Sequence, residues 1–180
     1  KPAPQWAMLI DLRRCTSCKA CTAGCIAEQK SPPGIIYRPV YEEETGTFPK
    51  VKRRFTPRPC QQCDNPPCVS VCPVPDGKAT WKSTSGISNG IVMINYTECI
   101  GCGNCVTACP YKARNLDSGA FYTDSTPPVQ AYETSPTWEY GGKWPRVKGQ
   151  RPVGAARKCH FCVHRLKAGM VPMCVSTCIC

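Results

Sequence analysis

The seventeen cysteines of this 180-residue chain are its most distinctive chemical feature, and sixteen of them fall into four groups of four. The groups are Cys15, Cys18, Cys21 and Cys25; Cys60, Cys63, Cys68 and Cys72; Cys99, Cys102, Cys105 and Cys109; and Cys159, Cys162, Cys174 and Cys178. The first and third groups share the spacing C-x2-C-x2-C-x3-C, and Pro110 follows the third. Thiolates at this density bind metals or form disulfides. Cys180 is left over.

The spacing C-x2-C-x2-C-x3-C-P is the signature of bacterial ferredoxins. Three close cysteines hold one 4Fe-4S cluster, and the fourth reaches a neighbouring cluster. Small residues in these loops permit the close approach of backbone that a cluster needs; they are Ser17, Ala20, Gly24, Gly101 and Gly103. Four such groups in one chain predict four 4Fe-4S clusters.

Two other readings of the cysteines are weaker. A disulfide framework is poorly served by cysteines two residues apart in every group. A zinc site joins two separated pairs and has no use for a further cysteine three residues on. A cysteine-rich zinc scaffold nevertheless remains an alternative from a different functional class, and metal analysis would distinguish it.

The rest of the composition indicates a chain that needs its cofactors to fold. Without the cysteines, about a third of the residues are apolar, which is little for a self-supporting core. Nineteen prolines and fourteen glycines predict short elements and many turns. The longest apolar runs, residues 6–10 and 91–94, are far shorter than the roughly 20 residues that cross a bilayer.

The net charge of +11 does not indicate a partner made of nucleic acid. That value counts cysteines as neutral, whereas four thiolate-bound clusters contribute about −8, which leaves about +3. The chain also lacks a clustered basic helix or a nucleic-acid-binding motif. Many basic residues instead lie close in sequence to the cysteine groups, where positive charge stabilises a reduced cluster.

The second and third groups flank a predicted hairpin, with extended stretches at residues 79–82 and 91–94 and a turn at 83–90. Motif, hairpin, motif is the ferredoxin plan, so residues 55–115 are predicted to form an inner ferredoxin-like module. The exchanged fourth cysteine predicts two ligand sets: Cys60, Cys63, Cys68 and Cys109 for cluster 3, and Cys99, Cys102, Cys105 and Cys72 for cluster 4.

Residues 1–29 and 151–180 are then predicted to form an outer module of the same kind, split in sequence by the inner one. Its ligand sets are Cys15, Cys18, Cys21 and Cys178 for cluster 1, and Cys159, Cys162, Cys174 and Cys25 for cluster 2. Residues 6–11 are expected to form an edge strand whose partner would follow the fourth group, so the polypeptide is expected to continue beyond Cys180. The predicted fold class is α+β, with one loop-rich module inserted in the other and clusters holding both together.

Two segments lie outside the modules. Residues 30–54 connect them and carry the acidic run Glu42, Glu43 and Glu44. Residues 116–150 are rich in Pro, Gly and aromatic residues and show neither helical nor strand periodicity. The aromatic residues of this insert either contact a partner or cover the protein's own surface.

The chain resembles the four-cluster iron-sulfur subunit of membrane-bound molybdopterin oxidoreductases of the DMSO reductase superfamily, most closely the polysulfide, thiosulfate and tetrathionate reductase branch. The matching runs are AMLID before Cys15, CQQCDNPPC from Cys60, CIGCGNC from Cys99 and KCHFC ending at Cys162. In some relatives tryptophan replaces one ligand of the third group. Here Cys102 keeps that position, which implies four complete clusters.

The resemblance implies an electron-transfer subunit with no substrate-converting site of its own. Its implied partners are a molybdopterin-containing catalytic subunit and an integral membrane subunit that handles quinol, with a cytochrome as a further candidate. It would be peripheral on a membrane complex of anaerobic respiration, with the outer, periplasmic face favoured over the cytoplasmic one. The alternative within the same chemistry is a free-standing soluble polyferredoxin.

Three further side chains invite a ligand role. His160 and His164 are predicted to make hydrogen bonds or to lie at the surface, because sixteen cysteines already have suitable spacing. Cys180 is predicted to be a free thiol. The sequence contains no catalytic triad or phosphate-binding loop, and it names neither the substrate of the complex nor the direction of electron flow.

Overall fold

A computed structural model describes residues 3–128 and 130–180. Residues 1, 2 and 129, which belong to the predicted outer module and insert, lie outside the described residues. The helices are α1 (Ala20–Gln29), α2 (Pro67–Ser70), α3 (Asn104–Thr107), α4 (Ala131–Thr134), α5 (Val163–Lys167) and α6 (Met173–Ser176). The strands are β1 (Val40–Thr45), β2 (Lys52–Pro57), β3 (Thr80–Lys82), β4 (Val92–Ile94), β5 (Arg114–Leu116), β6 (Thr137–Glu139), β7 (Gly142–Trp144) and β8 (Ala156–Lys158). The elements are short, as the proline and glycine content predicts.

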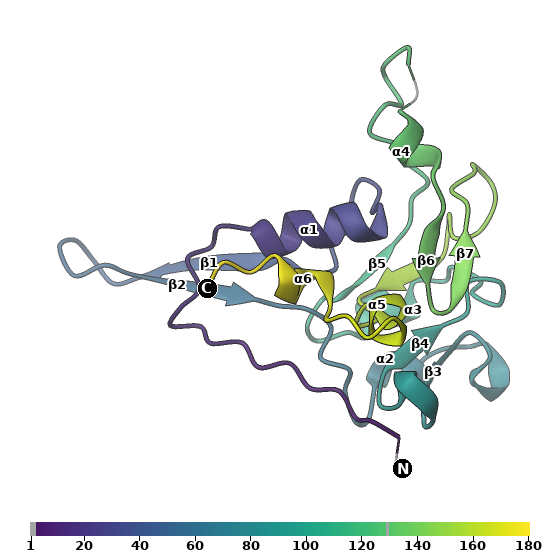
Figure 1. Ribbon diagram of the computed structural model, residues 1–180, viewed down its shortest axis with the longest axis horizontal. Helices are drawn as coiled ribbons and strands as arrows, with labels where there is room; N and C mark the ends of the chain where they lie inside the picture. The colour runs from purple at the N-terminus through teal and green to yellow at the C-terminus, as the bar shows by residue number, and fades with distance from the viewer. Residues whose placement is uncertain (1–2, 129) are drawn as a thin grey trace.

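The strands form antiparallel pairs, and the described residues contain no wider sheet. β3 and β4 form the predicted hairpin, with Thr80 opposite Ile94. β1 and β2 form a longer hairpin that projects away from the body of the molecule (Figure 1). β5 pairs with β8, so that Arg114 lies opposite Lys158 and the end of the predicted inner module is joined to the start of the fourth cysteine group.

The predicted edge strand at residues 6–11 is not formed. The segment pairs with no strand among the described residues and is irregular; its last residue, Asp11, accepts a turn hydrogen bond from the backbone N–H of Arg14. It is attached through a side chain, because the indole Nε1 of Trp6 donates a hydrogen bond to the carbonyl oxygen of Ile87, at 2.7 Å. Since a strand is defined by paired backbone groups, an apolar run without a neighbouring strand stays extended but unpaired.

The insert at residues 116–150 has more regular structure than its sequence indicates. It contains helix α4 and the hairpin β6–β7. Tyr140 and Gly141 form the two-residue turn of that hairpin, and both have a positive φ, of 53° and 86°. Positive φ at both central positions is the geometry of a type I′ turn, which Asn-Gly or Asp-Gly usually announces. Tyr-Gly is not one of these pairs, so the sequence did not predict this hairpin.

The aromatic residues of the insert divide into a partly buried and an exposed set. Tyr140 and Trp144 pack edge-on against Tyr96, with ring centroids 5.4 and 5.1 Å apart. Tyr122, Tyr132 and Trp138 are exposed. Tyr140 and Trp144 therefore cover the protein's own surface, whereas the exposed residues are available to contact a partner.

The hydrophobic core consists of small separate clusters. One contains Cys68, Val92, Cys105 and Ala156, and another contains Cys25, Ile35 and Tyr37. Cysteines are thus part of the core, and no cluster is large enough to organise the chain alone.

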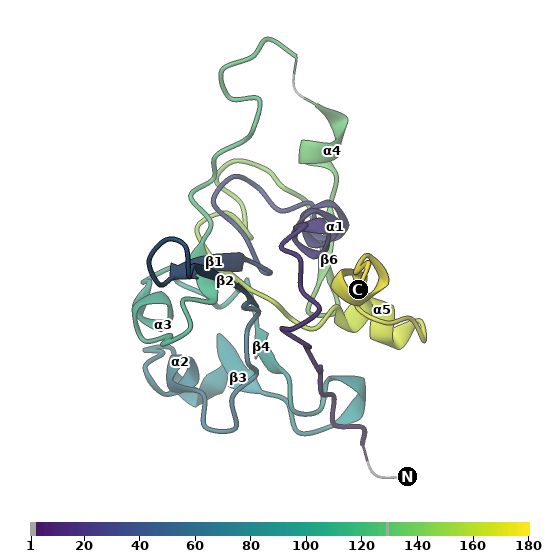
Figure 2. The ribbon, with the colours of Figure 1, turned by 90° about the vertical axis from the view of Figure 1, so that its left-hand side faces the viewer.

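The first and last helices pack against each other, although about 150 residues separate them (Figure 1). Gly24 of α1 makes the close approach possible, because a Cβ atom at this position would lie only 2.7 Å from Cγ2 of Thr177. In the view of Figure 2, α1 and α5 lie to one side of the body, whereas α2, α3, β3 and β4 lie to the other.

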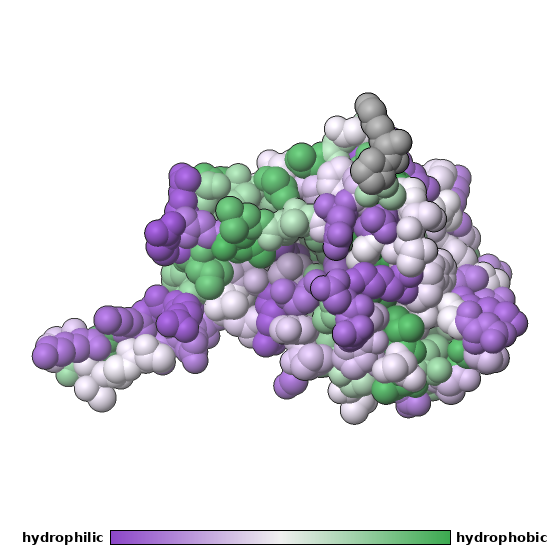
Figure 3. All heavy atoms as spheres, turned by 90° about the horizontal axis from the view of Figure 1, so that it is seen from below, coloured by the Kyte–Doolittle hydropathy of each residue, from purple (hydrophilic) through white to green (hydrophobic). Residues whose placement is uncertain are grey.

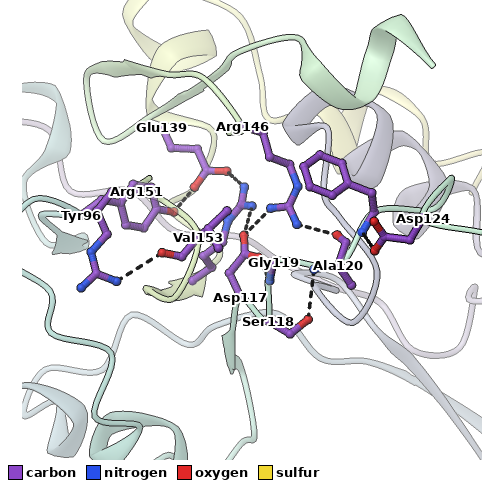
Figure 4. Close-up of polar contacts among 12 residues, drawn as sticks. Tyr96, Asp117, Ser118, Gly119, Ala120, Asp124, Glu139, Arg146, Arg151 and Val153 are labelled. Atoms are coloured by element: carbon purple, nitrogen blue, oxygen red, sulfur yellow. Dashed lines mark hydrogen bonds and ion pairs between the residues drawn. The ribbon is translucent and has the colours of Figure 1, made fainter. Parts of the chain in front are cut away.

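A buried network of charges ties the insert to β8 (Figure 4). Arg157 donates from Nη1 to Asp117, at 2.9 Å, and from Nη2 to Glu139, at 2.5 Å. Arg146 donates to the same oxygen of Asp117, at 2.6 Å. The hydroxyl of Tyr96 donates to Glu139. Burial alone would raise the pKa of Glu139, but Arg157 and other neighbours lower it, so this carboxylate is ionised in the folded protein.

We expect Asp117→Asn to destabilise the folded protein by about 3 kcal/mol, because it leaves two buried guanidinium groups short of a countercharge. Glu44→Gln is the control, since it breaks an exposed pair with Arg53 and should cost less than about 1 kcal/mol. Anaerobic guanidinium unfolding followed by circular dichroism measures both. Equal unfolding midpoints for the two variants would contradict the structural role of the network.

Candidate iron-sulfur sites

Four cysteines from two groups line one cavity in the predicted inner module. Cys99, Cys102 and Cys105 come from the loop before α3 and from α3 itself. Cys72, which follows α2, completes the set. This loop lies close to the backbone of Gly154. Gly101 permits the contact, because it has a φ of 77° and because a Cβ at this position would lie only 2.2 Å from the carbonyl oxygen of Gly154.

A second cavity is lined by the opposite combination of groups. Cys60, Cys63 and Cys68 come from the second group, and Cys109 reaches them from the end of α3. α2 and α3 pack together, so the last cysteine of each group lies beside the other group. The two cavities are similar in size and in the number of thiols that line them.

The outer cysteines are arranged around α1 and α6. Cys15, Cys18, Cys21 and Cys178 line one large cavity together with Cys174 and Cys180. The buried Cys25 lies near Cys159, Cys162 and Cys174: after burial itself, these three thiols are the largest causes that raise its pKa. Cys180, predicted to be free, is exposed at the rim of the outer cavity.

N–H groups point at several of the cysteine sulfurs. Backbone amides of Ala113, Ala156 and Phe161 donate to Sγ of Cys109, Cys99 and Cys159, at 3.4, 3.5 and 3.4 Å. The side-chain amide of Gln29 donates to Sγ of Cys162, at 3.4 Å. Hydrogen bonds to sulfur are a recognised means of stabilising and tuning iron-sulfur clusters. The cavities, the thiols and these donors fit the predicted cofactors.

Across residues 3–128 and 130–180, no three His, Cys, Asp or Glu side chains lie close enough to hold one metal ion. All seventeen cysteines are free of disulfides. Burial, with help from the neighbouring Cys60, raises the pKa of the Cys159 thiol to about 12, so metal binding at this position must displace a proton.

Both histidines make hydrogen bonds, as predicted. His160 is buried, its Nε2 lies 2.9 Å from Oε1 of Gln29, and its Nδ1 accepts from the backbone N–H of Val163. Burial lowers the pKa of His160 to about 4, so the ring is neutral. His164 contacts Glu28, at 2.7 Å. Gln29, which supports both His160 and a cysteine sulfur, was not identified from the sequence, because a lone glutamine in a helix carries no spacing signal.

Exposure varies systematically among the cysteines. Cys18 and Cys178 of the outer cavity and Cys102 of the first inner cavity are exposed. The buried cysteines are Cys25, Cys68, Cys105, Cys162 and Cys174.

No helix in the described part of the chain is both long and apolar enough to span a membrane.

Comparison with known families identifies two overlapping matches. Residues 51–123 and residues 91–179 each match a 4Fe-4S dicluster domain. Two dicluster domains hold four 4Fe-4S clusters, in agreement with the number predicted from the sequence. Neither match supports the zinc alternative.

The chain is also similar to named components of reductases. It is 54% identical to a selenate reductase subunit of Mesobacillus selenatarsenatis, over 97% of this chain and 58% of that protein. It is 37% identical to a tetrathionate reductase subunit of Salmonella typhimurium, over 99% of this chain and 56% of that protein. With the arsenate respiratory reductase iron-sulfur subunit of a Shewanella species it shares 33% identity, over 95% of this chain and 76% of the relative.

The chain thus spans a little over half the length of the first two relatives and three quarters of the third. In each case nearly the whole of this chain is aligned. Together with the dicluster domains, these similarities confirm the resemblance drawn from the cysteine motifs: the chain belongs to the family of ferredoxin-type iron-sulfur subunits of molybdopterin-dependent respiratory reductases.

Proposed function

We propose that this chain relays single electrons through four 4Fe-4S clusters, between a membrane subunit that handles quinol and a molybdopterin catalytic subunit of a respiratory oxidoreductase. The gathering of cysteines into cavities, each with thiols from two groups, is the observation that carries this proposal. It is peripheral on a membrane complex, and we place it on the outer face.

The ligand sets that we propose follow the exchange of fourth cysteines. Cys109 joins Cys60, Cys63 and Cys68, and Cys72 joins the third group; the linings of the two inner cavities support both assignments. Cys178 joins the first group and Cys25 joins the fourth. Their support is the packing of α1 on α6 and the proximity of Cys25 to the thiols of the fourth group.

This pairing makes the outer module discontinuous in sequence. Residues 1–29 and 151–180 form it, residues 55–115 form the inner module, and residues 30–54 connect the two. The nested arrangement is supported by the contact of the first and last helices and by the position of α2, α3, β3 and β4 on the opposite side of the body (Figure 2).

The clusters supply the one-electron carriers, and the chain's own residues hold, order and shield them. Thiolates bind iron, amide N–H groups stabilise the charge on sulfur, and burial of Cys25, Cys68 and Cys162 excludes water from the middle of the series. The proposed order is cluster 1, cluster 2, cluster 3, cluster 4. Electrons enter and leave at clusters 1 and 4, whose ligands include exposed cysteines.

Both proposed ends of the series have exposed apolar side chains beside them. Leu9, which is 96% exposed, lines the outer cavity with Cys18, and Ile100 is exposed beside Cys102. Figure 3 shows a hydrophobic area next to the base of the projecting hairpin, which is itself largely hydrophilic. Apolar surface at an electron-exchange site favours fixed partners over the charged docking face of a diffusing polyferredoxin. The exposed aromatic residues of the insert, Tyr122, Tyr132 and Trp138, extend the proposed partner surface.

The relatives support the two partners. One is named as an iron-sulfur subunit of a menaquinone reductase, and it is 39% identical over 89% of this chain and 60% of that protein. Others are named for reductases of selenate, tetrathionate and arsenate. We therefore propose a complex that exchanges electrons with quinone in the membrane and reduces an oxyanion, with the choice of oxyanion set by the catalytic subunit.

Metal analysis of anaerobically purified protein should give about sixteen irons and sixteen acid-labile sulfides per chain, with the broadened EPR signals of spin-coupled clusters after reduction by dithionite. Zinc near four per chain with no paramagnetic signal would rule out electron transfer. Co-purification with a catalytic and a membrane subunit in equal amounts separates the complex from a soluble polyferredoxin, which would purify alone.

Replacement of Cys109 by Ser should disturb the cluster of Cys60, Cys63 and Cys68, because the fourth ligand is exchanged between groups. EPR-monitored redox titration distinguishes the clusters. Cys180→Ser, which changes a cysteine outside the proposed ligand sets, is the matched control and should leave all four signals unchanged. Selective loss of the cluster held by Cys99, Cys102 and Cys105 in the Cys109 variant would overturn the exchange.

A further inference from the structure

Five basic side chains are buried in this chain, and they fall into two classes. The buried set is Arg38, Arg114, Arg146, Arg157 and Lys158. Arg146 and Arg157 form ion pairs with Asp117 and Glu139. Within the described residues, the other three have no carboxylate within ion-pair distance. The three without a carboxylate are also the three that adjoin the cysteine sets.

Arg114 lies between the two inner cavities. Its side chain lines both of them, and the residue is 3% exposed. Nη2 donates to the hydroxyl of Thr80, at 2.9 Å. Nε is buried and has no hydrogen-bond partner in the described residues. The guanidinium therefore has a free donor beside Cys68 of one set and Cys105 of the other. Both cysteines raise the pKa of Arg114.

Lys158 lies between an inner and an outer set. The residue is fully buried, and its Nζ donates to the carbonyl oxygen of Cys159, at 2.7 Å, and to Oε1 of Gln62, at 3.2 Å. Gln62 stands in the loop between Cys60 and Cys63. One ammonium group thus contacts the ligand loops of proposed clusters 2 and 3.

Arg38 occupies the corresponding position between the two outer sets. It is 7% exposed and lines the outer cavity together with Cys21 and Cys174, which belong to proposed clusters 1 and 2. Nη1 donates to the sulfur of Met8, at 3.2 Å, which is a weak acceptor. Nε is buried without a partner among the described residues, as in Arg114.

A buried cation without a countercharge costs several kcal/mol, so three of them in a small protein need an explanation. Each thiolate-bound cluster carries a net negative charge of about −2 when oxidised and one more unit when reduced. The clusters are therefore the countercharges. Since reduction adds negative charge, a fixed positive charge nearby favours the reduced form and raises the reduction potential.

We propose that Arg38, Lys158 and Arg114 form a series of fixed cations, one at each junction between consecutive clusters, and that each raises the reduction potentials of the two clusters beside it. The proposal rests on the ligand sets of the proposed function. The three side chains take no part in bond making or breaking. Burial lowers the pKa of Lys158, but the neighbouring cysteine sulfurs oppose this shift, and in the proposal all three side chains stay charged while one electron is exchanged between neighbouring sites.

The test uses the full-length subunit in its native complex, with the variants R38Q, K158Q and R114Q. In EPR-monitored redox titrations, R114Q should lower the potentials of clusters 3 and 4, K158Q those of clusters 2 and 3, and R38Q those of clusters 1 and 2. At a fixed solution potential, the ratio of reduced to oxidised cluster should fall about tenfold or more in each affected pair.

Lys112→Gln is the matched control. It removes the same charge two residues from Arg114, but Lys112 is exposed, so solvent screens it and its effect should be much smaller. The variant R114K keeps the charge and should restore most of the potential. Equal shifts in R114Q and K112Q, or shifts spread evenly over all four clusters, would overturn the proposal.

Iron content separates the possible failures. If the unaltered complex lacks about sixteen irons per chain, the proposed function fails before any variant is measured. If R114Q retains all its iron and its potentials do not move, the proposed function stands and the cation series fails. If a glutamine variant does not assemble its clusters, the methionine variants R38M, R114M and K158M replace it, because they also remove the charge but keep an unbranched side chain. A shift confined to the two adjoining clusters supports the proposal, and unchanged potentials overturn it.

Discussion

Bonds between cysteine sulfur and iron do in this chain what a hydrophobic core does in most domains. The apolar clusters contain only a few buried residues each, and the described strands pair only in twos, so each joins distant segments through a small number of contacts. The cysteine sets combine residues that lie far apart in sequence, from the first helix to the last. We therefore expect cluster binding to contribute much of the free energy that keeps the folded chain together.

The positive charges of buried side chains are compensated in two ways. Away from the cysteines, Arg146 and Arg157 are neutralised by buried carboxylates in a network that fastens the insert to the body. Beside the cysteines, buried cations have no carboxylate, and the anionic cofactors balance them. The excess of basic residues in the composition is thus distributed inside the protein as well as over its surface, which is why the high net charge misleads as a guide to partners.

The sequence predicted the cofactors, the hairpin β3–β4 and the short elements, because cysteine spacing and turn composition are local signals. It was wrong about residues 6–11, where an apolar run lacks a neighbouring strand, and about the regularity of residues 116–150. At the turn of Tyr140 and Gly141, the Tyr140 ring packs against Tyr96, a contact between distant residues that no local signal indicates. Burial of Arg114 and Lys158 is likewise a product of the β5–β8 pairing, and nothing adjacent to them in sequence indicates it.

The absence of a side chain at Gly24 has a consequence for motion. Because α1 rests directly on Thr177, the two helices that bear the outer cysteines are in van der Waals contact and cannot approach further. Packed helices compress very little, whereas loops fluctuate by ångströms. The spacing of the outer redox sites is thereby insulated from thermal fluctuation of the loops that carry their other ligands. The hydrogen atom of Gly24, where any other residue would have a Cβ, thus sets the distance between the two outer helices.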